Sequence, residues 1–351
     1  MNANIQSPAA TLSVSYAGMA GAGALTVSCE GDSILVDRHG ANLATRECLL
    51  QARFLPEQGV TDLAWGEIAG AQWQRGVLLA ALQGVFTRDR TISMVRLNTA
   101  NVHDAARDAL RRCGVLTADG WCLREACVQQ PDLWLTDAVP LPPAALSYAM
   151  TNGARHPRRA AYPDRIVYTR QVPSFGHCFA LRTASIEADL PALHRWLNEA
   201  RVNAFWGEAG TLQDHRAYLE RQLAAPHVHP LIGLFDGEPF GYFEAYWAKE
   251  DRIAPFADPG EHDRGLHMLV GDTRWRGPAC AAAWLPSLVH YLFLDDPRTQ
   301  AVLCEPRHDN VRMIAYLREH GFAAIKPFDF PHKRALLMRT SREAFFDARP
   351  I

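Results

Sequence analysis

The order of apolar and polar positions predicts alternating strands and helices in the second half of the chain. A short apolar segment favours a buried strand, whereas apolar residues three and four positions apart favour a helix. Short apolar segments predict strands at 179–182, 231–235, 240–246, 265–270 and 301–304. Helical spacing and capping residues predict helices that begin after Ser185 and Thr211, and two more at 279–293 and 310–320. This order indicates a mixed α+β domain.

The first half of the chain has a weaker pattern. Residues 11–16 alternate between apolar and polar, which is typical of a half-buried strand. Two more strands are expected at 24–29 and 33–36, and helices are expected at 74–86 and 101–113. No grouping of chemically active side chains is found in this half, so we interpret it as structural.

Residues 150–175 differ in composition from both flanking halves. They contain a basic cluster at 155–159, with Pro163 and Pro173 after it, and such turn-rich segments usually connect domains. We therefore expect an N-terminal domain at 1–150, a linker at 151–177 and a second domain at 178–345. The basic cluster is either part of this linker or a clamp on the phosphates of a ligand.

Composition narrows the functional class only slightly. The chain has 351 residues, 36 of them basic and 38 acidic, and this near balance gives no reason to expect a nucleic-acid partner. Eight cysteines are scattered without a CxxC pair, so we expect no metal site. The N-terminus lacks the pattern of a secretory signal, and no stretch approaches the length of a membrane span, so we expect a cytoplasmic protein without a membrane partner.

The turn between the strand at 265–270 and the helix at 279–293 has the features of an anion site. It contains an RxxGxA pattern formed by Arg274, Gly277 and Ala279. A glycine turn before a helix offers free N–H groups and the positive end of the helix dipole to an anion, and Arg274 and Arg276 add charge. The alternative interpretation is a solvated arginine turn. Neither GxxxxGK[ST] nor GxGxxG is present here.

This turn resembles the pyrophosphate-binding turn of the GNAT acyltransferases, which hold acyl-CoA. Asn310 and Gly321-Phe322 match the ending of GNAT domains, and 285–322 is similar to the corresponding segment of aminoglycoside 6'-N-acetyltransferases. One position departs from the family. Leu317 stands where many members have the tyrosine that protonates the departing thiolate, and Tyr316 is one residue away.

A narrower resemblance rests on Trp196-Leu197-Asn198, Trp206, 241–247, Asp251-Arg252 and 264–267. With these segments the chain resembles the siderophore-biosynthesis GNAT acyltransferases, the group of the aerobactin N6-hydroxylysine acetyltransferase. The resemblance covers about residues 150–340. It implies an α+β GNAT fold, with a central mixed twisted sheet flanked by helices, and a degenerate GNAT-like N-terminal half.

The resemblance also implies a reaction and a set of site residues. The reaction is acetyl transfer from acetyl-CoA, as co-substrate, to an N-hydroxylated side-chain amine, with N6-hydroxylysine favoured, in hydroxamate siderophore biosynthesis. The catalytic candidates are His267, as base or substrate orienter, and Glu305. The expected acyl-CoA-binding residues are Leu269, Val270, Arg274, Arg276, Gly277, Pro278, Ala279, Asn310 and Arg312. The expected acceptor-binding residues are Trp206, Glu244, Tyr246 and Trp247.

Several alternatives remain open from the sequence. His267 could be a core histidine satisfied by the backbone, and Glu305 a plain strand-end carboxylate. Trp206 and Trp247 could belong to the core. The acceptor could instead be an aminoglycoside or another small amine. A further hypothesis is that the chain is a non-catalytic acyl-CoA-binding protein. The sequence does not distinguish a monomer from a homodimer, or one hydroxylated amine from another.

Overall fold

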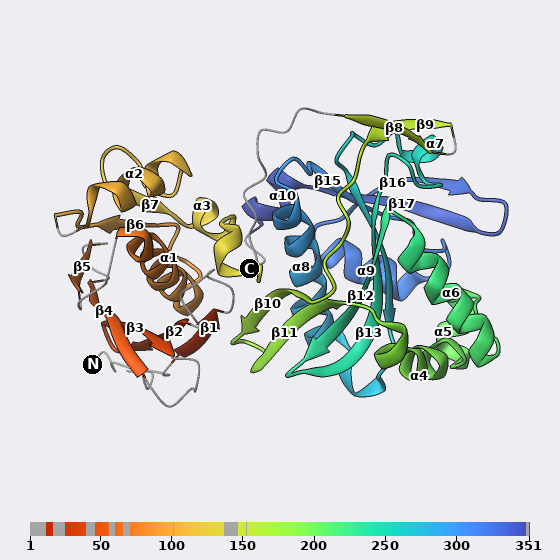
Figure 1. Cartoon of the computed structure of the whole chain (residues 1–351), viewed down its shortest axis with the longest axis horizontal. Coiled ribbons are helices and arrows are strands. Elements are labelled where there is room, and N and C mark those ends of the chain that lie inside the picture. Colours follow the sequence, from red (N-terminus) through yellow and green to blue (C-terminus); the bar gives the residue numbers. More distant parts are fainter. Residues whose placement is uncertain are drawn as a thin grey trace, which may run out of the picture. The chain divides into compact units, whose positions relative to one another are not determined.

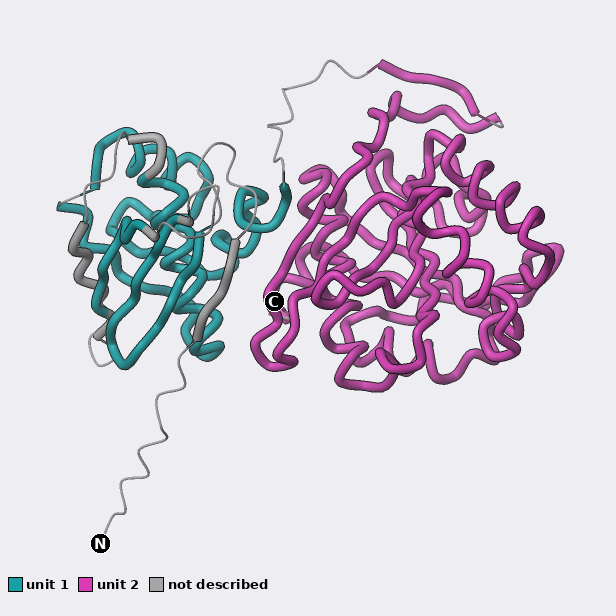
Figure 2. The backbone as a smooth tube through the Cα atoms, turned by 60° about the horizontal axis from the view of Figure 1, so that its bottom comes forward, with its two compact units in different colours: residues 1–138 teal, residues 139–351 magenta. Residues whose placement is uncertain are grey.

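The computed structural model describes residues 12–16, 25–39, 46–55, 60–65, 71–100, 102–136, 147–151, 153–348 and 351. The chain divides into two compact units, residues 1–138 and 139–351, which are coloured separately in Figure 2. Each unit has its own sheet. None of the helices in the described part of the chain is both long enough and apolar enough to cross a bilayer.

The N-terminal unit is a twisted sheet with one long helix packed on it (Figure 1). Its described strands lie in the order β1 to β7, all antiparallel except the parallel pair β5–β6, and α1 connects those two strands. The strands are β1 (Leu12–Tyr16), β2 (Leu25–Glu30), β3 (Ser33–His39), β4 (Arg46–Leu55), β5 (Val60–Trp65), β6 (Met94–Leu97) and β7 (Trp121–Leu123). The helices are α1 (Ala71–Arg88), α2 (Asp104–Arg112) and α3 (Arg124–Val128), followed by a 3-10 turn, η1 (Pro131–Leu133).

The C-terminal unit contains an eight-stranded sheet in the order β10-β11-β12-β13-β14-β15-β17-β16 and a separate hairpin, β8–β9, among the described residues. The strands are β8 (Tyr148–Thr151), β9 (Ala154–Pro157), β10 (Ile166–Val172), β11 (His177–Thr183), β12 (Val228–Phe235), β13 (Glu238–Trp247), β14 (Arg264–Val270), β15 (Ala301–Cys304), β16 (Ala323–Asp329) and β17 (Arg334–Ser341). The helices are α4 (Ile186–Leu197), α5 (Ala200–Trp206), α6 (Leu212–Ala224), α7 (Ala254–Ala257), α8 (Pro278–Asp295), α9 (Val311–Glu319) and α10 (Arg342–Asp347), with a 3-10 turn, η2 (Thr273–Trp275).

Alternate residues of β13 face different helices, as the pleat of a strand requires. Phe243 stacks on Trp284 of α8, with ring centroids 5.5 Å apart. The neighbouring Tyr242 belongs to the core cluster that includes Leu193 of α4 and Leu219 of α6. One face of the sheet therefore packs on α8, and the other packs on α4 and α6 (Figure 1).

The central strands β14 and β15, which pair in parallel, diverge along their length. β14 pairs with β13 along its whole length, but it pairs in parallel with β15 only at Arg264 and Gly265. Beyond Gly265, the edge of β14 that faces β15 has no ladder partner among the described residues. This divergence opens the sheet between the end of β14 and the start of α9.

Most of the elements predicted for the second half are confirmed by the structure. β15 has the predicted bounds, and Asp236-Gly237 forms the hairpin turn with positive φ at both residues. Thr211 and Asp214 form a capping box at the start of α6. Asn310 caps α9, because its side chain accepts the Met313 N–H.

One prediction needs correction. The predicted linker at 151–177 contains β10, which pairs with β11 and belongs to the C-terminal sheet. Pro163 and Pro173, which are typical of a linker in the sequence, flank this strand, where a proline removes no ladder hydrogen bond. Between the helices predicted after Ser185 and Thr211, the structure adds a separate helix, α5, which was not predicted. In the first half, Thr11, residue 24 and residue 101 of the predicted elements lie outside the described residues.

Candidate active site

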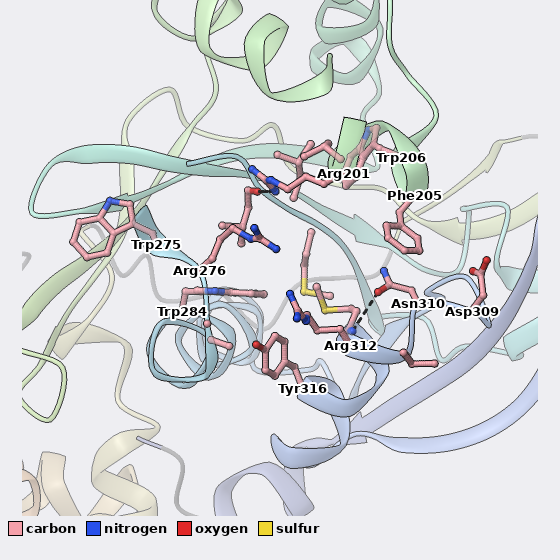
Figure 3. Close-up of a pocket in the computed structure, with 18 residues that line it drawn as sticks. Arg201, Phe205, Trp206, Trp275, Arg276, Trp284, Asp309, Asn310, Arg312 and Tyr316 are labelled. Carbon is pink, nitrogen blue, oxygen red and sulfur yellow. Dashed lines mark hydrogen bonds between the residues drawn. The ribbon is translucent and has the colours of Figure 1, made fainter. Parts of the chain in front are cut away.

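The divergence of β14 and β15 forms one wall of a pocket of about 350 Å³. Met268, Leu269 and Val270 of β14 line it on one side, and residues from α5, α8 and α9 complete it. Figure 3 shows Arg276, Trp284, Arg312 and Tyr316 directed toward the same space. Phe205, Asp309 and Asn310 lie at the opposite end of the pocket from Trp275 (Figure 3). The pocket therefore combines elements that are more than 100 residues apart in the sequence.

The charges along the pocket favour an anionic ligand. Its lining includes three arginines, Arg201, Arg276 and Arg312, and one acid, Asp309. Arg201 also closes the end of β14, because its guanidinium donates hydrogen bonds to the Val270 carbonyl at 2.8 Å and to the Gly271 carbonyl. The other two arginines, Arg276 and Arg312, line the pocket together with aromatic side chains, among them Trp284.

The predicted RxxGxA turn contributes to this pocket through only some of its residues. Gly277 lines the pocket with φ of 112°, a conformation that glycine adopts without strain. Arg276 also lines it, whereas Arg274 points to other groups and pairs with Asp272 at 2.8 Å and with Glu238 at 3.0 Å. Pro278 and Ala279 form the first turn of α8 and do not line the pocket.

His267 lies between two carboxylates. Glu244 is directly opposite His267 in the β13–β14 pair, and its Oε2 lies 2.7 Å from Nδ1 of the imidazole. Glu305, which follows β15, places Oε1 2.6 Å from Nε2. Both ring nitrogens therefore have a carboxylate partner, and the side chain is 19% exposed.

Tyrosines and a lysine complete this carboxylate–imidazole network, which we define as Glu244, His267 and Glu305 with their hydrogen-bond partners. Tyr218 and Tyr242 donate to Oε1 of Glu244, the latter at 3.0 Å. Tyr246 donates to Oε2 of Glu305 at 2.7 Å, and the Lys333 ammonium lies 3.7 Å from Oε1. The Tyr246 ring crosses over Gly265, where a Cβ would lie 2.0 Å from the ring.

The network holds His267 in its protonated form. Burial alone would lower the pKa of His267, but the charges and hydrogen bonds of Glu305 and Glu244 outweigh it and raise the pKa to about 10. Burial disfavours ionisation of Glu305, yet the neighbouring His267 and Lys333 lower the pKa of its carboxyl to about 2. In this state His267 is a hydrogen-bond donor rather than a proton acceptor.

The structure separates the predicted residues into three groups. The pocket is lined by Leu269, Val270, Arg276, Gly277, Asn310, Arg312 and Trp206. The carboxylate–imidazole network contains His267, Glu305, Glu244 and Tyr246. Trp247 lies in neither place: it is buried between the guanidinium groups of Arg159 and Arg264, 4.2 and 4.1 Å from its ring. The Trp206 ring centroid is 6.3 Å from that of His267, so the pocket and the network approach each other there.

Some residues of the site were not predicted from the sequence. Tyr316 lines the pocket, while Leu317 at the expected tyrosine position is fully buried, because the phase of α9 turns residues 310, 313 and 316 to the pocket. Arg201, Phe205 and Tyr218 come from α5 and α6. Only the aromatic composition around Trp206 could have indicated Phe205, and no local pattern indicates that Tyr218 reaches Glu244.

Comparisons with known proteins agree with this arrangement. A family model described as an acetyltransferase (GNAT) domain matches residues 185–330. The N(6)-hydroxylysine O-acetyltransferase of Escherichia coli is 36% identical over 291 residues, which cover 81% of this chain and 91% of that protein. A Schizosaccharomyces pombe protein, provisionally named a lysine N-acyltransferase, is 46% identical over 57% of this chain and 60% of its own length. An N(5)-hydroxyornithine:cis-anhydromevalonyl coenzyme A-N(5)-transacylase of Beauveria bassiana is 44% identical over 56% of this chain and 44% of its own length.

The chain thus spans nearly the whole bacterial relative and about half of the two fungal ones. The segment matched by the acetyltransferase (GNAT) model contains both the diverging strands and the pocket beside β14, and the chain is a GNAT acyltransferase. Within that class, the chain belongs to the siderophore-biosynthesis acyltransferase family, as its identity over most of the bacterial relative shows.

The raised pKa of His267 predicts a pH-dependent stability. The contribution of protonated His267 should be fully present below the unfolded value of 6.5 and should be lost as the pH rises toward about 10. Compared with His267→Gln, the wild-type chain should therefore be more stable at pH 6, by on the order of a few kcal/mol, and this advantage should shrink by pH 10. Denaturant unfolding of both proteins across this range measures it, and a constant difference would show that His267 is neutral.

Proposed function

We propose that this chain transfers an acyl group, acetyl in the first instance, from acyl-CoA to the side-chain nitrogen of an N-hydroxylated amine. N6-hydroxylysine is the leading acceptor, and the product is a hydroxamate for a siderophore. The observation that carries the acceptor and the acetyl donor is the 36% identity to N(6)-hydroxylysine O-acetyltransferase over 91% of that protein, with a cationic pocket in the matching domain. Acylation of nitrogen rather than oxygen is supported by the relative named as an N(5)-transacylase of hydroxyornithine.

The pocket residues have distinct roles in this proposal. Arg276 and Arg312, with the N-terminus of α8 behind Gly277, bind the phosphates of acyl-CoA. The edge of β14 beyond Gly265 offers a backbone N–H to the oxyanion that forms when the nitrogen attacks the thioester carbonyl. Trp206, whose ring lies 6.3 Å from that of His267, covers the reacting end and excludes water from it.

In the reaction, the C–N bond forms, the C–S bond breaks, the nitrogen loses a proton and the thiolate gains one. A hydroxylamine is largely neutral at pH 7 and is a good nucleophile, so it needs little help from a base. This agrees with a protonated His267, which cannot take the proton of the acceptor. Both of its ring N–H groups already donate to Glu244 and Glu305, so we propose that His267 orients the acceptor through its positive charge rather than through a hydrogen bond.

We also propose that the N-terminal unit is a degenerate copy of the same fold. In both units an 18-residue helix connects two central strands that pair in parallel, α1 between β5 and β6 and α8 between β14 and β15. Aligned on their helix starts, the two sequences have Gly70 where Gly277 stands but Ala69 where the pocket-lining Arg276 stands. An alanine at that position offers no charge to a phosphate.

The product identifies both the acceptor and the acylated atom. Purified protein with acetyl-CoA and N6-hydroxylysine should release free thiol and give a coloured iron(III) complex, because an N-acylated hydroxylamine is a bidentate hydroxamate ligand. O-acylation would release thiol without that colour. Thiol release with lysine or kanamycin but not with N6-hydroxylysine would overturn the proposed acceptor class. If none of these acceptors causes thiol release, the enzymatic function is overturned.

Two neighbouring arginines provide a matched test of the phosphate site. Arg276→Gln should raise the KM for acetyl-CoA by on the order of tenfold, because a charged hydrogen bond to phosphate is lost. Arg274→Gln should change it by no more than about twofold, because Arg274 is exposed and paired outside the pocket. Calorimetric titration should also give one acyl-CoA per chain. Equal effects of the two substitutions would contradict the assignment, and two sites per chain would contradict the degenerate N-terminal unit.

Tyr316 is the proposed proton donor to the departing thiolate. Tyr316→Phe should lower kcat by on the order of a hundredfold, the usual contribution of a general acid, with little change in the KM for acetyl-CoA. Steady-state kinetics at saturating acceptor measure both constants. An unchanged kcat would mean that solvent protonates the thiolate.

A further inference from the structure

An ion pair at the edge of the pocket is not used by the chemistry described so far. Asp309 lines the pocket beside Phe205 (Figure 3). Nε and Nη2 of Arg307 donate to its two carboxylate oxygens at 3.0 and 2.6 Å. Nη1 of Arg307 donates to the Ala204 carbonyl at 2.6 Å, and the guanidinium lies 5.4 Å from the centre of the Phe205 ring. The pair is thus fixed in place at the end of α5.

Both members of this ion pair can form further hydrogen bonds to a ligand. The hydrogen bonds described use three of the five N–H donors of Arg307, and each oxygen of Asp309 can accept a second hydrogen bond. The two side chains are 38% and 46% exposed, so the pair contributes little to stability. A fixed positive and a fixed negative group therefore stand side by side and accessible, next to the apolar ring of Phe205, which is itself 45% exposed.

The chemical group that matches this arrangement is the head of a free α-amino acid, which carries an ammonium and a carboxylate on one carbon. Building on the proposed function, we propose that Arg307 binds the α-carboxylate of the acceptor and Asp309 binds its α-ammonium. The acceptor is then an N-hydroxylated amino acid rather than a hydroxylated diamine. Phe205 supports its methylene chain, and Trp206 leads from there toward His267.

The backbone places this head-group site at a defined position relative to the reacting end. Glu305, Arg307, Asp309 and the helix cap Asn310 belong to one short connection between β15 and α9. Arg307 forms a bridge with Ala335, and the His308 N–H donates to the Arg334 carbonyl at 3.1 Å. The head-group site is therefore held by the sheet, as is Glu305 of the network.

A purely mechanical role for Arg307 makes a different prediction. Its hydrogen bond to Ala204 could serve only to hold α5, and with it the wall formed by Phe205 and Trp206. Loss of that wall would impair every acceptor equally. Acceptors that lack one charge of the head group therefore separate the two roles.

The test compares three acceptors with wild type, Arg307→Gln and Asp309→Asn. N6-hydroxylysine has both head-group charges, N-hydroxycadaverine has only the ammonium, and N-pentylhydroxylamine has neither. Arg307→Gln should lower kcat/KM for N6-hydroxylysine by about tenfold or more and leave the other two within about twofold. Asp309→Asn should lower it for N6-hydroxylysine and N-hydroxycadaverine and spare N-pentylhydroxylamine. Arg334→Gln removes another exposed arginine, which is 3.9 Å from Asp329, and serves as the matched control.

The outcomes are distinguishable from failure of the proposed function. If wild type forms hydroxamates but Arg307→Gln impairs all three acceptors equally, or none of them, the head-group site is overturned and the proposed function stands. A wild-type preference for N-hydroxycadaverine over N6-hydroxylysine would also overturn the site. If wild type forms no hydroxamate from any of the three, the proposed function fails together with the inference.

Discussion

The structure of the C-terminal unit depends on a parallel strand pair that ends after two residues. β14 and β15 are joined at Arg264 and Gly265, and they then diverge. The pairing fixes the two strands as neighbours, so Glu305 at the end of β15 reaches His267 on β14. The divergence leaves the rest of β14 as an open edge beside α8 and α9. Longer pairing would close the pocket, and no pairing would separate the two catalytic candidates.

Charge balance explains how the carboxylate–imidazole network can be buried. Glu244 and Glu305 contribute two negative charges, and protonated His267 and Lys333 contribute two positive ones. Three tyrosine hydroxyls supply further donors to the carboxylates. Burial of charge is costly unless each group is paired and hydrogen-bonded, and this condition is met here. The network can therefore hold an imidazolium in place next to the pocket without requiring it to act as a base.

Local patterns predicted the elements better than they predicted the neighbours of each side chain. Short apolar segments and capping residues located β15, the turn at Asp236-Gly237 and the start of α6, because each depends on residues close in sequence. The contact of Glu244 with His267 depends on the register of β13 and β14, which alternation alone does not fix. The stacking of Trp247 between Arg159 and Arg264 involves segments about 90 residues apart, so no window of sequence contains it.

The position of Tyr316 in the pocket also does not follow from the local sequence pattern. Many family members have the proton-donating tyrosine seven residues after the asparagine, and this position is Leu317 here. The cap at Asn310 sets where α9 begins, and the helical phase that follows places Leu317 in the core and Tyr316 in the pocket. A difference of one residue in the sequence is thus a difference of about 100° around the helix.

The close approach of Tyr246 to Gly265 has a consequence for the history of this strand. A side chain at 265 and an aromatic ring at 246 exclude each other, because the Cβ would overlap the ring. Among related sequences we therefore expect these two positions to covary. Replacement of the glycine would require the ring to move away or to be lost first, so the order of the two substitutions is constrained as well.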